Sequence, residues 1–215
     1  MNRQLRLLGL TAVAVVAFSA ISVAQATAAA NFHFESTPTY LKGVQETKNV
    51  LATKSGTVKC SVVEITSSPV IPLSIESVVF HPTYSGCTAF GQAASVSTTS
   101  CSYTLSVNEN SASFGRIGTN CSVGTSIVVT VTAGGCTISV GAQAPSSFLV
   151  SYTSSGAGAS REITVTFSVS VLTYTSSGGI CGTAGTESVG TYSGTLKIAG
   201  FESAAFLVKH GIWTT

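Results

Sequence analysis

The residues best able to carry chemistry in this sequence are its six cysteines, which stand at 60, 87, 101, 121, 136 and 181. Sulfur at these positions could serve a metal, a redox couple, a catalytic thiol or a disulfide. The chain contains no C-x-x-C, so a thioredoxin-like couple and a zinc ribbon lack their characteristic spacing. An even number of cysteines in an exported chain indicates a disulfide framework.

Counting residues along strands favours one pairing of these cysteines. The stretch CSVGTSIVVTVTAGGC places a strand of about seven residues between Cys121 and Cys136, so they stand roughly 20 Å apart. A disulfide needs Cα atoms within about 7 Å. The preceding hairpin, with Val107 opposite Ser111, brings Cys121 just beyond its open end, near Cys101. The favoured pairs are Cys101 with Cys121 and, by elimination, Cys136 with Cys181 and Cys60 with Cys87. A crossed connection would instead join Cys121 to Cys136, and this alternative stays open.

The remaining titratable residues form no known catalytic or metal motif. All eight acids are glutamates, so an Asp-containing triad and an EF-hand loop lack their ligands. The histidines, His33, His81 and His210, are scattered. No G-x-S-x-G nucleophile elbow and no phosphate-binding glycine loop occurs. We therefore predict no catalytic residue, no metal and no cofactor. A glutamate-dependent hydrolase is kept as an alternative, and a cleft with two facing glutamates would be its mark.

Aromatic residues give one indication of binding. Tyr84 and His81 lie in the segment FHPTYSGC, which its proline and glycine predict to be a loop. Because loops carry function more often than strands do, these two residues are the candidates for surface binding. The other tyrosines are interpreted as core residues or cross-strand pairs.

The N-terminal 30 residues read as a secretory signal peptide. MNRQLR supplies positive charge, an apolar run follows, and cleavage is expected after Ala26 or Ala30. Removing Arg3 and Arg6 from ten basic residues leaves eight against eight acids, so the mature net charge is zero. Without a basic stripe we expect no nucleic-acid partner, and after signal removal no membrane span. The predicted location is extracellular or at the cell surface.

Residues 31–215 are predicted to form a single all-β domain. Short runs of Val, Ile, Phe and Thr are separated by Ser, Gly and Asn. In the clearest run, REITVTFSVSVLTY, hydroxyl residues alternate with Ile163, Val165, Phe167, Val169 and Val171, and these five apolar residues are predicted to face the core. An outer-membrane barrel is disfavoured because its outward face would be apolar. We predict an antiparallel β-sandwich, Greek-key or meander, held by disulfides. The tract around Gly156 is predicted to be a hairpin loop. The predicted strands are 56–65, 75–80, 92–98, 101–107, 112–119, 125–132, 136–141, 147–152, 161–174, 191–199 and 203–209.

Four short motifs, GTVKCS, YSGCTAFG, CSY and GTYSGTLKIAG, carry a resemblance to a group of small secreted proteins. The chain resembles uncharacterised, disulfide-containing, β-rich proteins of actinobacteria-like soil bacteria. The resemblance implies secretion and paired cysteines, and it lends no catalytic residue.

These observations predict a secreted, noncatalytic protein that binds an extracellular partner, such as a cell-envelope glycan or another protein, or that contributes to an envelope layer. One alternative is a pilin-like or coat-like subunit that assembles by strand addition. An unpaired terminal strand, for instance at 31–44, would distinguish it. The other alternative is the glutamate-dependent hydrolase.

Overall fold

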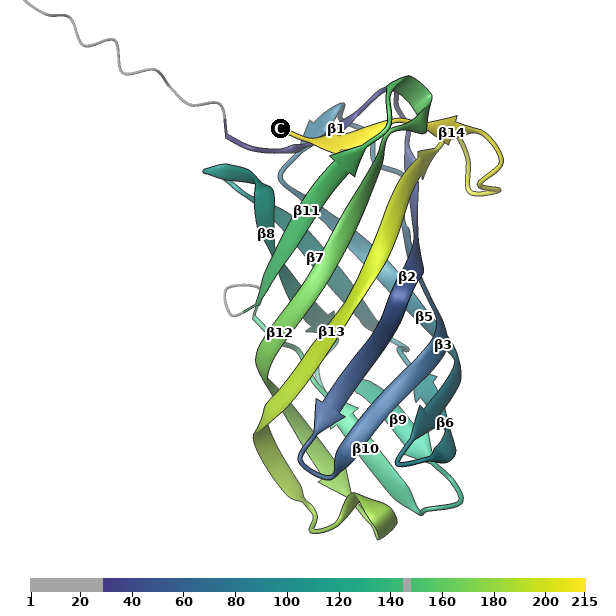
Figure 1. Ribbon diagram of the computed structural model, residues 1–215, viewed down its shortest axis with the longest axis vertical. Helices are drawn as coiled ribbons and strands as arrows, with labels where there is room; N and C mark the ends of the chain where they lie inside the picture. Colours follow the sequence, from purple (N-terminus) through teal and green to yellow (C-terminus); the bar gives the residue numbers. More distant parts are fainter. Residues whose placement is uncertain (1–28, 145–147) are drawn as a thin grey trace, which may run out of the picture.

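The computed structural model describes residues 29–144 and 148–215, and these residues form a closed antiparallel β-barrel of eight strand positions (Figure 1). The strands follow one another around the barrel in chain order. Closure comes from β13 (Gly185–Phe201), the last long strand, which pairs with β2 (Tyr40–Thr53), the first long strand. The predicted β-sandwich is therefore wrong. The predicted signal peptide, 1–30, lies almost wholly outside the described residues.

Five of the eight positions are each filled by one long strand, and we call them the continuous wall. Its ladder runs β12–β13–β2–β3–β5 without a gap between neighbours. The strands not yet given are β3 (Gly56–Ser67), β5 (Ser77–Ala89) and β12 (Glu162–Ser177).

The other three positions are each filled by two short strands placed end to end, and we call them the interrupted wall. The pairs are β6 (Gln92–Ser97) with β7 (Cys101–Asn108), β9 (Ile127–Val131) with β8 (Ser111–Cys121), and β10 (Cys136–Val140) with β11 (Leu149–Ser155). β5 pairs with β7 along one half and with β6 along the other, and β12 changes partner from β11 to β10 in the same way. β7, β8 and β11 thus form the upper half of this wall, and β6, β9 and β10 the lower half (Figure 1).

The interruptions explain why the sequence resembles that of a sandwich. Three barrel strands appear as six short runs, which is the strand length typical of sandwiches. The sequence does not predict β2, the strand that closes the ring, because Gln45, Thr47 and Asn49 interrupt its alternation of apolar and polar residues. Closure is a property of strand pairing, and the pattern along a single strand does not encode it.

The alternating face of β12 packs into the barrel as predicted for Ile163, Val165, Phe167 and Val169, all of which are buried. The predicted continuation to Val171 is wrong, because a bulge between Val169 and Leu172 turns Val171 outward.

A small sheet lies across the upper end of the barrel (Figure 1). Its order is β15 (Ile212–Thr214), β1 (Phe32–Phe34), β4 (Ser74–Ile75). Phe32 and Phe34 are buried in the core, and the Phe32 ring meets the Tyr152 ring edge-on at 5.4 Å. The segment 31–44 therefore contains no unpaired strand, since β1 pairs on both sides and β2 lies between β13 and β3. β14 (Lys209–His210) is all that forms of the strand predicted at 203–209.

The three disulfides join the pairs that the strand count favours: Cys60–Cys87, Cys101–Cys121 and Cys136–Cys181. The assumed hairpin register differs, however. Cys101 lies directly opposite Cys121, because a register shift after Val107 places that residue opposite Gly115. A side chain at Gly115 would collide with the Ser106 carbonyl and the Tyr152 ring, so only glycine permits this register.

Two 3-10 turns complete the described elements. η2 (Gly158–Ser160) occupies the β11–β12 loop, where the hairpin loop around Gly156 was predicted. η3 (Gly179–Cys181) lies between β12 and β13, and its Cys181 bonds to Cys136 at the start of β10.

Candidate functional site

A cavity of about 70 Å³ lies inside the barrel at the level where the interrupted wall breaks. Its lining includes side chains from both sides of each break: Val96 and Tyr103, Ile127 and Ile117, Val140 and Phe148. The continuous wall supplies the opposite side. Its lining residues are Asn49, Leu51, Val58, Cys60, Tyr84, Val169, Leu172 and Tyr192. The cavity is therefore mostly apolar, with a few polar atoms from tyrosines, Asn49 and Thr119.

Tyr84 belongs to this cavity and His81 does not. The predicted loop FHPTYSGC is wrong, because this segment continues β5 past Pro82, which is buried. His81 is exposed on the outer face, whereas Tyr84 points inward. The structure thus separates the two surface-binding candidates, and it makes Tyr84 an interior residue.

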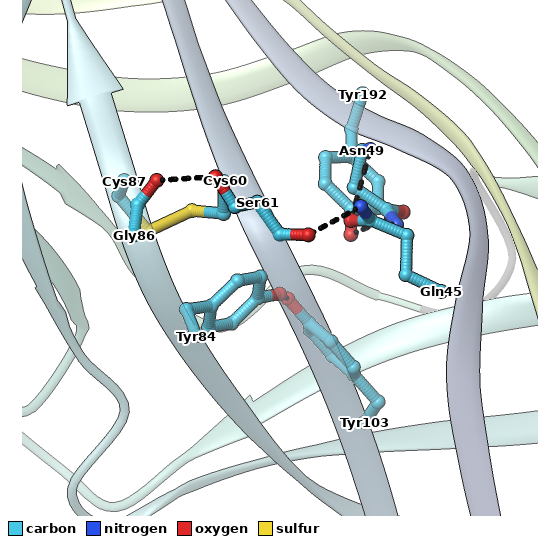
Figure 2. Close-up of a disulfide and its surroundings, with 9 residues drawn as sticks. All are labelled: Gln45, Asn49, Cys60, Ser61, Tyr84, Gly86, Cys87, Tyr103 and Tyr192. Atoms are coloured by element: carbon cyan, nitrogen blue, oxygen red, sulfur yellow. Dashed lines mark hydrogen bonds between the residues drawn. A yellow bond between two sulfur atoms is a disulfide. The ribbon is translucent and has the colours of Figure 1, made fainter.

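The hydroxyl groups of Tyr84 and Tyr103 meet in a hydrogen bond inside the barrel (Figure 2). Burial raises the pKa of Tyr103 to about 12, and burial together with the neighbouring Tyr103 and Tyr192 raises the pKa of Tyr84 well above 10. Both tyrosines therefore keep their protons at neutral pH. They act as uncharged hydrogen-bonding groups.

A second polar pair, Asn49 and Tyr192, lies on the continuous wall of the cavity. The Tyr192 hydroxyl donates to Asn49 Oδ1 at 2.9 Å, and the Asn49 amide nitrogen donates to Gln45 Oε1 at 3.1 Å (Figure 2). Irregular pairing between β2 and β13 makes room for this buried asparagine. A side chain at Gly194 would come within 2.3 Å of Asn49 Oδ1. Burial also raises the pKa of Tyr192, so its hydroxyl stays protonated.

Sequence reasoning treated Tyr103 and Tyr192 as ordinary core tyrosines and missed Asn49. The alternation of side chains along β2 contained a signal for Asn49, because Asn49 and the apolar Leu51 lie on the same face of the strand. A polar residue in phase with inward apolar residues indicates a polar group in the interior, where it must find a partner.

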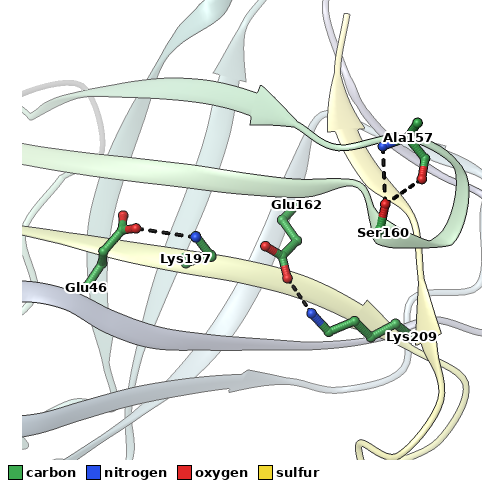
Figure 3. A network of polar contacts seen from close by, with 6 residues as sticks. All are labelled: Glu46, Ala157, Ser160, Glu162, Lys197 and Lys209. Atoms are coloured by element: carbon green, nitrogen blue, oxygen red, sulfur yellow. Dashed lines mark hydrogen bonds and ion pairs between the residues drawn. The ribbon is translucent and has the colours of Figure 1, made fainter.

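Several glutamates that a hydrolase would need lie instead in ion pairs on the outer surface. Glu46 pairs with Lys197 at 3.3 Å and Glu162 with Lys209 (Figure 3). Further pairs of the same kind are Lys42–Glu64 and Lys54–Glu187. All four join strands or turns of the continuous wall and its β14 extension.

A second pocket, of about 340 Å³, lies near the β7–β8 turn and contains Glu76, Glu109 and Arg116 in its lining. A cleft with two facing glutamates is the feature expected of a glutamate-dependent hydrolase, and this pocket contains two glutamates in its lining. Within residues 29–144 and 148–215, no group of three or more histidine, cysteine or acidic side chains could hold a metal ion. His33 is engaged elsewhere, stacked on Trp213 and bonded to the Thr215 hydroxyl.

Comparisons with protein-family models, curated proteins and solved structures find no match for this chain. Among the residues that the structure describes, none forms a helix with the length and apolar character needed to cross a membrane. The fold and the site together define a disulfide-bonded eight-stranded barrel with an interior cavity. Three disulfides are typical of extracellular proteins.

Proposed function

We propose that this chain is a secreted, noncatalytic protein that binds a small molecule inside its barrel. The observation that carries the proposal is the apolar cavity at the breaks, where three tyrosine hydroxyls and one amide collect. Ligand sites are concave and mostly apolar, with a few well-placed polar groups that set orientation. An eight-stranded barrel is wide enough to hold one small ligand.

Noncatalytic binding is supported by the chemistry of the cavity lining. Its tyrosines hold their protons tightly, and its disulfide sulfur, from Cys60, is not a thiol. Among the described residues, no carboxylate, amine or imidazole lines it. These groups suit holding a ligand in place and do not suit proton transfer at neutral pH.

Export to the cell exterior is part of the same proposal. It is supported by the tripartite signal at 1–30 and by the three disulfides. Sequencing the N-terminus of protein recovered from the culture medium should find Thr27 or Asn31. Material beginning at Met1 would contradict the proposal.

Xenon is a suitable first probe of the cavity because it enters small apolar cavities without needing a polar anchor. Under xenon pressure, amide shifts in a ¹⁵N-labelled sample should change around Val96, Val129 and Leu172. Replacing Val96 by Phe should abolish these changes by filling the cavity. The matched control is Val62→Phe, since Val62 lies on the outer face of β3 and is 46% exposed.

Two outcomes would overturn this function. One is the absence of xenon-dependent shifts in the native protein, and the other is equal shifts in both variants. Retention of the protein on cell-wall glycan, unaffected by Val96→Phe, would then assign the function to the outer surface.

A further inference from the structure

The hydrogen bonds of Asn49 determine which neighbouring hydroxyl donates a proton and which atom accepts it. Its amide nitrogen is engaged by Gln45 Oε1 at 3.1 Å and by the Thr47 carbonyl at 3.4 Å. The remaining oxygen, Oδ1, is an acceptor, so Tyr192 must donate its proton to it. The Tyr192 oxygen is therefore left with lone pairs and no spare proton.

The Tyr84 and Tyr103 pair adds one spare hydroxyl proton. Two hydroxyls that bond to each other use one of their two protons, and the other remains available. Tyr192 lines the same cavity and contributes to the raised pKa of Tyr84. If the spare proton turns to Tyr192, a chain of hydrogen bonds runs from Tyr103 through Tyr84 and Tyr192 to Asn49. The Tyr103 oxygen, at the start of this chain, then remains free to accept a hydrogen bond.

If the spare proton does not turn to Tyr192, the three tyrosines offer one donor, from Tyr84 or Tyr103, and acceptors that include the Tyr192 oxygen. The Thr119 hydroxyl on the same lining can also donate and accept. An acceptor is thus present in both arrangements. A ligand hydroxyl satisfies either of them, because it can donate and accept at once. A carbonyl can only accept, so the tyrosines offer it a donor only in the second arrangement.

The cavity also selects against charge. Its described lining has no acidic or basic side chain that could neutralise a charged ligand. A bare ammonium or carboxylate would lose its hydration without gaining a partner of opposite charge. The same low polarity disfavours the ionised form of the tyrosines themselves.

We propose that the ligand is a small neutral alcohol, whose hydroxyl bonds to the tyrosines and whose hydrocarbon part packs between the two halves of the interrupted wall. This inference rests on the proposed function. The cavity, about 70 Å³, has roughly half the volume of the engineered cavity of about 150 Å³ that binds benzene. An alcohol with a few carbon atoms suits that space.

Three compounds of one shape test the chemistry: butan-2-ol, butanone and protonated butan-2-amine. Their dissociation constants can be measured by NMR shift titration of the full mature protein. The alcohol should bind about five- to tenfold more tightly than the ketone, which corresponds to one net hydrogen bond. The ammonium compound should show no saturable shifts in the cavity.

Tyrosine variants assign the preference to named hydroxyls. Tyr103→Phe and, separately, Tyr192→Phe should reduce the ratio between alcohol and ketone toward one while xenon still enters. Tyr152→Phe is the matched control, because the Tyr152 hydroxyl is buried but donates to the Ser106 carbonyl outside this cavity. It should keep the native ratio.

The outcomes separate the two proposals. If xenon enters but butanone binds as tightly as butan-2-ol, or if the alcohol preference survives in both Tyr103→Phe and Tyr192→Phe, the alcohol inference is overturned and the cavity function stands. If xenon does not reach the cavity, the proposed function itself fails.

Discussion

The continuous wall and the interrupted wall of the barrel are stabilised in different ways. In the continuous wall, strands of 12 to 17 residues are paired with their neighbours, and four ion pairs lie on the outer surface of these strands, the β2–β3 turn and β14. In the interrupted wall, the hydrogen-bond ladders stop in the middle of the wall, where one short strand of each position ends and the next begins. There Cys101, the first residue of β7, bonds to Cys121, the last residue of β8, so this disulfide stands at the edge of the break.

This contrast connects stability with the candidate function. A barrel of uninterrupted strands would fill its interior with interdigitating side chains. Breaking three neighbouring strands at one level removes that packing locally and leaves a cavity there. The continuous wall supplies the opposite side of the site and most of its polar side chains, namely Asn49, Tyr84 and Tyr192.

The largest effect is expected from truncating one isoleucine in each wall. Ile163, fully buried on β12, should lose about 4 kcal/mol of unfolding free energy when replaced by Ala. Ile127, which is 7% exposed and borders the cavity, should lose about 2 kcal/mol, because it has fewer packing partners on one side. Urea unfolding of both variants measures the difference, and equal losses would remove the contrast between the walls.

Removing the disulfide at the break should have the next largest effect. The double variant Cys101→Ser with Cys121→Ser should lose about 3 kcal/mol in the chain-entropy model. The control, Cys60→Ser with Cys87→Ser, opens a loop of similar length in the continuous wall and should cost about as much.

Hydrogen exchange should distinguish these two disulfide variants. Amides of β7 and β8 near the break should exchange faster in the first variant. Those of β3 and β5 should stay protected in the second, because their ladders continue on both sides of the disulfide. Faster exchange spread evenly over the barrel in the first variant would contradict a local role.

High pH should weaken the fold through the buried tyrosines. The pKa of Tyr103 is about 12 in the folded protein and about 10 when unfolded, so the folded state holds the proton more tightly. Stability is therefore complete below pH 10 and falls between pH 10 and pH 12, by about 2 kcal/mol for this one group. Urea midpoints at pH 9 to 12 should show a shallower fall in Tyr103→Phe. An identical pH dependence in both proteins would contradict this assignment.

The smallest effect is expected on the outer face of the continuous wall. Lys197→Ala removes the ion pair with Glu46, in which both side chains are about 40% exposed. Exposed pairs contribute little, so the loss should stay below about 0.5 kcal/mol and disappear at high salt. A loss above about 1.5 kcal/mol would mean that these surface pairs hold the continuous wall together.

Part of the site could be predicted from the sequence. The alternation of β12 assigned its inward residues correctly as far as Val169, and residue counting favoured the three cysteine pairs that the structure contains. The sequence, however, predicted a loop at Tyr84, because Pro82 and Gly86 are residues that usually end a strand. In the barrel, the edge of β5 between its contacts with β7 and β6 tolerates both residues.

By itself, the sequence determined the all-β character, the inward and outward faces of its most regular strands and the favoured disulfide pairs, because these depend on local period and spacing. Only the tertiary structure decided that the strands close into a ring, since closure depends on β13 meeting β2 more than 130 residues away. Only the tertiary structure, too, brought Asn49, Tyr84, Tyr103 and Tyr192 to one cavity. Each comes from a different strand, and a site assembled across a barrel leaves no spacing signal along the chain.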